Sequence, residues 1–178
     1  MADAHDRSVR LTDLGFLPQI GLRLDAGDAA SMAAVAGVLG LTLPSEPCRV
    51  AREGQRRALW LGPDEWLVVA PGDDAGRLIG ALEQALAGRH AAVLDLSWTR
   101  TVLEISGPDA QDTLEAGCLL DLHRSVFAAG TVAGTILAKS QVYLERETAG
   151  DGADVFRIYV RASFAEHMRQ WLARVMAV

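Results

Sequence analysis

The stretch Ser97–Leu122, SWTRTVLEISGPDAQDTLEAGCLLDL, joins a loop containing tryptophan and arginine to an expected strand and then to an expected helix. Residues 101–106 alternate in the pattern of a strand. Gly107-Pro108-Asp109 predicts the start of a helix, because proline is tolerated where the backbone N–H has no helical partner. A similar strand-then-helix pattern occurs earlier, where residues 20–24 alternate and Asp28 can cap a following helix. The sequence therefore predicts a duplicated fold.

The sequence pattern of each half predicts the order strand, helix, strand, strand, helix, and one more strand is expected after the first half. This order matches a ferredoxin-like βαββαβ unit, so we expect an α+β protein. The expected divisions are an N-terminal arm at residues 1–18, a first α+β half at 19–97 and a second α+β half at 98–178, together forming one compact unit. The arm ends in apolar residues, Leu14, Phe16 and Leu17, which could dock on a partner or fold back on the chain's own core.

Two local features of the second half carry structural predictions. Ser163 and Glu166 have the spacing of a capping box for the last helix. Cys118 is expected on the apolar face of the preceding helix as a buried, inert thiol.

Composition limits the classes of function. The net charge of −6 argues against nucleic acid as the main partner, because binding to phosphates needs a basic surface. The polar N-terminus has no signal-peptide pattern, and no apolar run reaches the ~18 residues of a membrane helix. We therefore expect a cytoplasmic protein without a membrane partner.

The sequence contains no complete catalytic or cofactor motif. Neither a GxGxxG nor a GxxxxGK[ST] pattern occurs, the two cysteines are far apart, and the four histidines are scattered. Asp121 with His123 is the one compact polar group, although neighbours in sequence seldom face one another. The sequence therefore predicts no catalytic, cofactor-binding or metal-binding residue in this chain.

The aromatic residues indicate contacts instead. Trp60 and Trp66 flank a turn and are expected to form a core pair across a hairpin. Trp98 lies in a loop beside Arg100, and both residue types are enriched in protein–protein hot spots. Trp98 and Arg100 are therefore the candidate partner contact, with a buried role as the alternative.

Two motifs in order, LGPDEWL at residues 61–67 and DLSWTRTVLEISGPD at residues 95–109, resemble the gamma subunit of heterotetrameric sarcosine oxidase. The resemblance runs from about Leu59 to the C-terminal helix. It implies a fold similar to the folate-binding domains of glycine-cleavage aminomethyltransferases. It also implies a small subunit without cofactors of its own, in a complex with larger flavin-bearing subunits that hold FAD, FMN, NAD and tetrahydrofolate.

In that family the complex oxidatively demethylates sarcosine to glycine, passes the one-carbon unit to tetrahydrofolate and produces hydrogen peroxide. The leading hypothesis is therefore a non-catalytic subunit of such an oxidase. Two alternatives remain open. The chain could be a free-standing folate-binding or one-carbon-transfer protein, with Asp95 and Glu104 as candidate pterin contacts, or a subunit of an oxidase acting on another N-methyl amine.

Overall fold

The computed structural model describes residues 8–150 and 152–177. The chain divides into two compact units. The central unit is Phe16–Thr99, and the terminal unit consists of Met1–Gly15 with Arg100–Val178. The sequence Gly150-Asp151-Gly152 predicts a flexible turn, but Asp151 lies outside the described residues.

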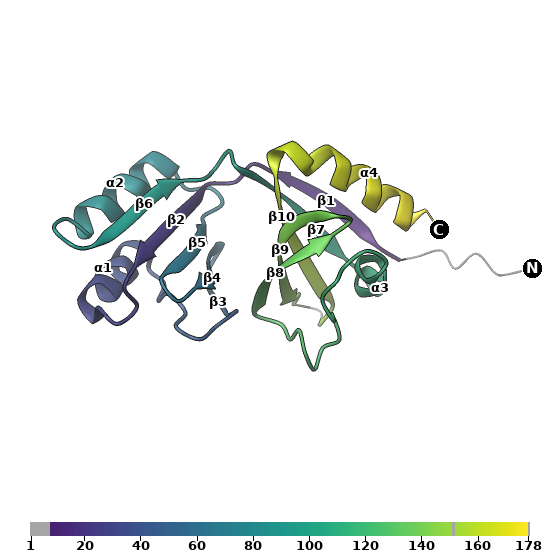
Figure 1. Cartoon of the computed structure of the whole chain (residues 1–178), viewed down its shortest axis with the longest axis horizontal. Helices are drawn as coiled ribbons and strands as arrows, with labels where there is room; N and C mark the ends of the chain where they lie inside the picture. The colour runs from purple at the N-terminus through teal and green to yellow at the C-terminus, as the bar shows by residue number, and fades with distance from the viewer. Residues whose placement is uncertain (1–7, 151, 178) are drawn as a thin grey trace, which may run out of the picture. The chain divides into compact units, whose positions relative to one another are not determined.

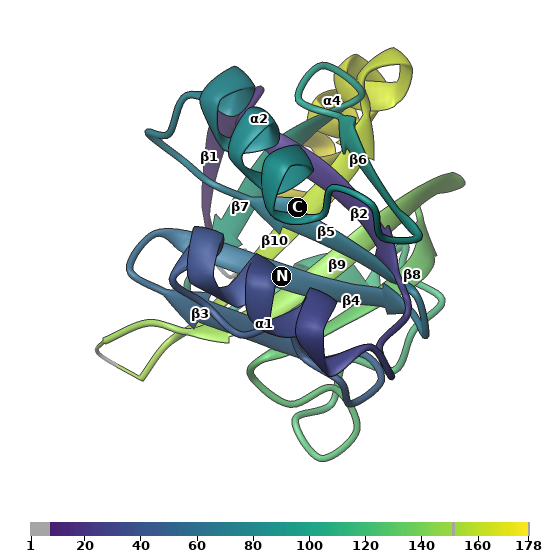
Figure 2. The same ribbon diagram turned by 90° about the vertical axis from the view of Figure 1, so that its left-hand side faces the viewer.

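The central unit is an antiparallel sheet with two helices on one face (Figures 1 and 2). The strand order is β3-β4-β5-β2-β6. Its elements are β2 (Gln19–Leu24), α1 (Ala29–Leu39), β3 (Val50–Glu53), β4 (Arg56–Gly62), β5 (Glu65–Val69), α2 (Ala75–Ala85) and β6 (Ala91–Asp95).

Short-range signals explain these elements. The Asp28 carboxylate accepts the backbone N–H groups of Ala30 and Ser31, which caps α1, and Gly40 ends the helix at a φ of 67°. Alternation in β2 points Ile20 and Leu22 toward the helices, where both are fully buried. The unit therefore has a core between its sheet and its two helices.

Trp60 and Trp66 are directly opposite each other on β4 and β5 and lie in the same core cluster, as the hairpin pattern predicts. Trp66 is fully buried, and its indole Nε1–H donates a hydrogen bond of 2.8 Å to the carbonyl of Pro44. This bond satisfies the polar atom of the largest buried side chain.

The terminal unit has the same plan. Its sheet has the order β1-β7-β10-β9-β8, and α3 and α4 contribute to a core on one face. Its elements are β1 (Arg10–Gly15), β7 (Arg100–Ser106), α3 (Ala110–Glu115), β8 (Thr131–Leu137), β9 (Ser140–Thr148), β10 (Asp154–Arg161), a 3₁₀ turn (Ala162–Phe164) and α4 (Ala165–Met176).

The two strand orders confirm the duplicated α+β fold. Each sheet contains the strand arrangement of a ferredoxin-like sheet and one additional edge strand. The additional strand is β3 in the central unit and β8 in the terminal unit. The strand at the other edge has a different origin in each unit: β6 follows α2, whereas β1 comes from the N-terminal segment and pairs with β7. Residues 10–15 of the expected arm are thus a strand of the terminal sheet.

Three local expectations differ from the structure. The segment Val50–Glu53 was not expected to be a strand, but it pairs with β4. The capping box is wrong, because Ser163 lies in the 3₁₀ turn and α4 starts without a side-chain cap. Cys118 lies beyond the end of α3, where it pairs with Leu137 in an isolated bridge.

A buried ion pair holds the long connection between α3 and β8. Arg146 is 1% exposed and contacts the carboxylate of Asp154 at 2.5 Å. The same guanidinium donates hydrogen bonds to the carbonyls of Leu122 and Phe127, at 2.8 and 2.9 Å. The connection is therefore attached to the sheet through one side chain.

Acidification is expected to weaken this attachment. Burial alone would raise the pKa of Asp154, but hydrogen bonds and charges from Arg146 and Arg124 outweigh it and hold the pKa below its ordinary value. A lowered pKa in the folded state contributes stability above the ordinary value of 3.8, and this stability is lost as the pH falls through the folded pKa. Urea unfolding from pH 6 to pH 3 should therefore show a steeper loss of stability in the wild type than in Asp154→Asn. Equal slopes would contradict this assignment.

The substitution Gly107→Ala is expected to cost about 1–3 kcal/mol of unfolding free energy. Gly107 has a φ of 112°, and an added Cβ would collide with the backbone carbonyl of Ser8, just before β1. The matched control is Gly80→Ala in α2, where an added Cβ meets no atom within 4 Å. The control should gain about 0.5–1 kcal/mol, since alanine favours helices over glycine. Urea unfolding should therefore show a lower unfolding free energy for Gly107→Ala and a higher one for Gly80→Ala than for the wild type.

Candidate partner-binding surface

Two exposed aromatic rings meet at the ends of the central unit. Phe16 precedes β2 and Trp98 follows β6, and these paired strands bring their flanking segments together. The ring centroids are 5.2 Å apart, while Trp98 is 75% exposed and Phe16 is 45% exposed. Such a pair presents a large apolar area to a partner.

The rings border a groove of about 240 Å³, which we call the aromatic groove. Its lining residues are Phe16, Leu17, Pro18, Ala75, Asp95, Ser97 and Trp98. Asp95 accepts the backbone N–H of Ser97 at 2.9 Å. Hydrogen bonds from the Ser97 hydroxyl and backbone hold the pKa of Asp95 below its ordinary value, so this exposed residue keeps its negative charge near neutral pH. The groove thus combines aromatic surface with a fixed carboxylate.

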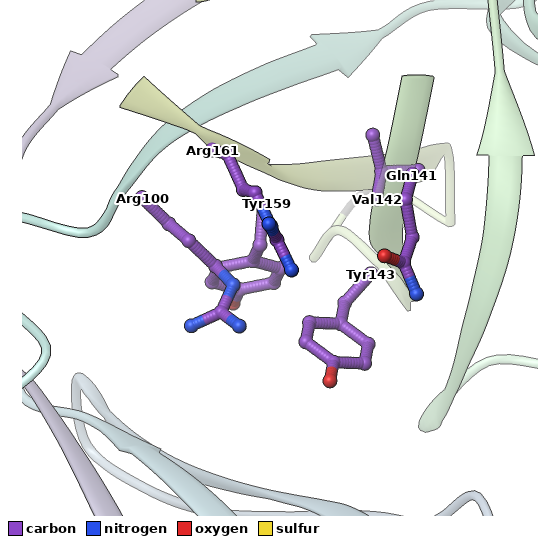
Figure 3. Close-up of a pocket in the computed structure, with 6 residues that line it drawn as sticks. All are labelled: Arg100, Gln141, Val142, Tyr143, Tyr159 and Arg161. Carbon is purple, nitrogen blue, oxygen red and sulfur yellow. The ribbon is translucent and has the colours of Figure 1, made fainter. Parts of the chain in front are cut away.

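Arg100 belongs to the terminal unit, so Trp98 and Arg100 lie on different units although they are close in sequence. The guanidinium carbon of Arg100 is 5.1 Å from the ring centroid of Tyr143. Arg100 lines a small pocket of about 40 Å³ with Gln141, Val142, Tyr143, Tyr159 and Arg161 (Figure 3). We call this the arginine pocket. Sequence reasoning found Arg100 and Trp98 but missed Phe16 as a ring partner and Arg161 as a neighbour of Arg100.

The polar residues considered for catalysis are engaged in local structure. The Asp121 carboxylate accepts the backbone N–H of His123 at 2.9 Å, and Nδ1 of the His123 ring lies 2.7 Å from the Ser125 hydroxyl. Nε2 of His167 lies 2.8 Å from the carbonyl oxygen of Ala138. Within residues 8–150 and 152–177, no group of three or more His, Cys, Asp or Glu residues could hold a metal ion.

The two candidate pterin contacts are not brought together within one unit. Asp95 is in the central unit, whereas Glu104 is in the terminal unit. Glu104 forms an ion pair with Arg157, with 2.8 Å between the guanidinium nitrogen and the carboxylate oxygen. It also borders an open depression of about 730 Å³. None of the residues lining this depression is aromatic, so it offers no ring to stack on a pterin.

None of the helices in the described part of the chain is both long and apolar enough to cross a membrane.

Solved structures define the class of fold. The chain superimposes over 94% of its length on the crystal structure of glycine cleavage system aminomethyltransferase T from Bartonella henselae, with a TM-score of 0.69 and 18% identity. It covers 46% of that larger chain. The protein therefore has the aminomethyltransferase-like fold that the resemblance implies.

Sequence comparison identifies the family. The model of the sarcosine oxidase, gamma subunit family matches residues 23–178. Sarcosine oxidase subunit gamma from Arthrobacter sp is 39% identical over 170 residues, which is 95% of this chain and 80% of that protein. The protein of the same name from Corynebacterium sp. (strain P-1) is 39% identical over 171 residues, 96% of this chain and 81% of that protein. A chain of the heterotetrameric sarcosine oxidase from Corynebacterium sp. U-96 superimposes with a TM-score of 0.86 and 38% identity, over 98% of this chain and 86% of that one. The chain belongs to the sarcosine oxidase gamma subunit family.

Proposed function

We propose that this chain is a non-catalytic subunit of a cytoplasmic heterotetrameric sarcosine oxidase. The observation that carries the proposal is the match to named gamma subunits at 39% identity over 95% of this chain and 80% of the relative. The superposition on a chain of a heterotetrameric oxidase supports the same assignment.

The reaction of the proposed complex is the oxidation of sarcosine by oxygen with tetrahydrofolate as the one-carbon acceptor. The N-methyl group of sarcosine loses two electrons, glycine is released, and oxygen takes up the electrons to become hydrogen peroxide. The FAD, FMN, NAD and tetrahydrofolate of this chemistry are held by the larger subunits, and this chain contributes contact surface.

The aromatic groove is the part of the chain that we assign to a partner subunit. Trp98 supplies exposed ring surface, and Asp95 supplies a negative charge beside it. The complementary group is an arginine or lysine side chain of the partner, since a cation can stack on the indole and pair with the carboxylate. This chain's net charge of −6 also favours a partner with a basic contact surface.

Co-purification tests the assembly. The tagged chain should be isolated from its native cells together with larger subunits, and the eluate should have a flavin absorption spectrum. Sarcosine-dependent production of peroxide would then identify the substrate, and a panel of other N-methyl amines would separate sarcosine from related substrates. A colourless chain without companions would overturn the proposal.

The alternative is a free-standing folate-binding protein, and only the shared aminomethyltransferase-like fold favours it. Titration of the purified chain with tetrahydrofolate, followed by tryptophan fluorescence, distinguishes the two hypotheses. A saturable change would favour the alternative, and a flat titration would favour the subunit.

A further inference from the structure

Strand β6 forms one edge of the central sheet, and in the described part of the chain it pairs only with β2 (Figure 1). The backbone N–H of Leu96 donates a 2.8 Å hydrogen bond to the carbonyl of Gln19, the first residue of β2. In an antiparallel pair, bonded residues alternate with residues whose backbone groups point away from the partner strand. In this register Leu94 also bonds to β2, whereas the N–H and C=O groups of Val93 and Asp95 point to the free edge.

The other three sheet edges have features that discourage the addition of a further strand. Strand β3 carries Arg52 and Glu53, and β1 carries Arg10 and Asp13. Strand β8 is bridged at its last residue by the segment that follows α3. Charged side chains and covering segments are common protections of sheet edges. Residues 91–94 of β6 carry no charge, and no described segment pairs with their free side, so this edge is open to a partner strand.

The side chains of β6 add an apolar contact and a charge to the open edge. Val93 packs against the core that contains the helices, so Leu94 lies on the opposite face of the sheet, where it is 53% exposed. Asp95 is exposed, its carboxylate accepts hydrogen bonds from Ser97, and no ion pair within the described residues neutralises it. Trp98 lies three residues beyond Asp95 and continues this surface into the aromatic groove.

The uncompensated carboxylate indicates the chemistry of the occupant. Residues directly opposite each other on adjacent strands have their side chains on the same face, close enough to interact. An arginine or lysine opposite Asp95 would therefore neutralise its charge, and an apolar residue opposite Leu94 would cover its exposed side chain. Residues 91–95 contain no basic side chain, so a second copy of β6 lacks the required cation. This favours a strand from a different chain.

We propose that a larger subunit of the complex adds one strand to the free edge of β6, with a basic residue opposite Asp95 and an apolar residue opposite Leu94. The proposal rests on the proposed function, because a larger subunit supplies the strand. Backbone hydrogen bonds to Val93 and Asp95 provide affinity, and the two side-chain contacts provide specificity, as in other cases of strand addition. The added strand extends the contact that begins at the aromatic groove.

Hydrogen–deuterium exchange, resolved to single residues, tests the edge. In the isolated chain the amides of Val93 and Asp95 should exchange about tenfold faster than that of Leu94, which bonds to β2. In the complex with the larger subunits, the Val93 and Asp95 amides should slow by about tenfold or more. If the complex forms and these two amides exchange as in the isolated chain, this proposal is overturned while the proposed function stands. If no larger subunit binds the chain, both fail.

Val93→Pro tests the outward hydrogen bond directly. It removes the N–H that points to the free edge and keeps the pairing with β2, and proline is tolerated in this position of edge strands. Binding to the larger subunits should weaken by about tenfold or more, because a buried carbonyl of the added strand loses its donor. The matched control is Val50→Pro on β3. The Trp60 N–H bonds to the Arg49 carbonyl, so Val50 points away from β4, and this variant should bind like the wild type. Equal affinities of the two variants would contradict the proposal.

Leu94→Lys provides a second test that leaves the backbone unchanged. A lysine on an edge strand opposes the addition of another strand, so binding should weaken by about tenfold or more. The control is Leu119→Lys, since Leu119 is an exposed leucine of the terminal unit, and it should leave the affinity unchanged. Sedimentation of the isolated chain examines the second copy as occupant. A dimer in which the Val93 amide is protected would overturn the assignment to a larger subunit.

Discussion

Arg146→Met is expected to lower the unfolding free energy by about 3–5 kcal/mol, the usual range for removing one partner of a buried ion pair. Arg146 is 1% exposed, and its guanidinium contacts Asp154 while satisfying the carbonyls of Leu122 and Phe127. Methionine fills a similar volume but donates no hydrogen bond. Two buried carbonyls and one carboxylate would therefore lose a donor at once, and each buried group left unsatisfied costs about 1–3 kcal/mol.

Equilibrium urea unfolding measures this loss, and Arg169→Met is the matched control. Arg169 forms an ion pair with Asp13 at 2.7 Å, but its side chain is 36% exposed. A surface pair contributes about 0–1 kcal/mol, so the control should remain close to the wild type. Hydrogen exchange should also show loss of protection in the 116–130 connection of Arg146→Met. Similar unfolding free energies for the two variants would mean that Arg146 does not organise this connection.

Local signals in the sequence were enough for most helices and strands. Asp28 and Gly40 mark the ends of α1 because capping depends on residues within one helical turn. The duplicated order followed from strand alternation and helix starts in the two halves. Such features are encoded within a few residues, so a single sequence contains them.

The two missed strands depend on distant partners. The β1 segment RLTDLG has a weak alternation and becomes a strand through pairing with β7, far away in the sequence. The β3 segment VARE is short and half polar, and its pairing with β4 completes the edge of the sheet. Neither local pattern predicts a strand, because the stabilising hydrogen bonds come from the partner strand.

The residues of the two candidate contact sites were only partly predictable, because these sites also depend on distant partner strands. The residue types of Trp98 and Arg100 indicated an exposed contact, and Trp98 is exposed. The ring contact with Phe16 and the pairing of Arg100 with Arg161 arise from strand register. Register is a property of the folded sheet, so the composition of these two sites could not be read from either segment alone.

Trp98→Ala is expected to weaken binding of this chain to the larger subunits by about 30-fold or more, which corresponds to the hot-spot threshold of about 2 kcal/mol. Trp98 presents most of its surface to solvent and borders the aromatic groove beside Asp95. Truncation removes the apolar area and the ring on which a partner cation would stack. The variant's own unfolding free energy should change by no more than about 0.5 kcal/mol, because the side chain is largely exposed.

Titration of the labelled chain into the larger subunits at low and high salt separates the two parts of this contact. Asp95→Asn should weaken binding mainly at low salt, since exposed charge pairs are screened. Trp98→Ala should weaken binding at both salt concentrations, because apolar burial is not screened. Phe164→Ala is the control, since Phe164 is an aromatic residue of the terminal unit that is 45% exposed, like Phe16, but lies outside the groove. If Trp98→Ala binds as tightly as this control, the partner contacts another surface and the aromatic groove does not mediate assembly.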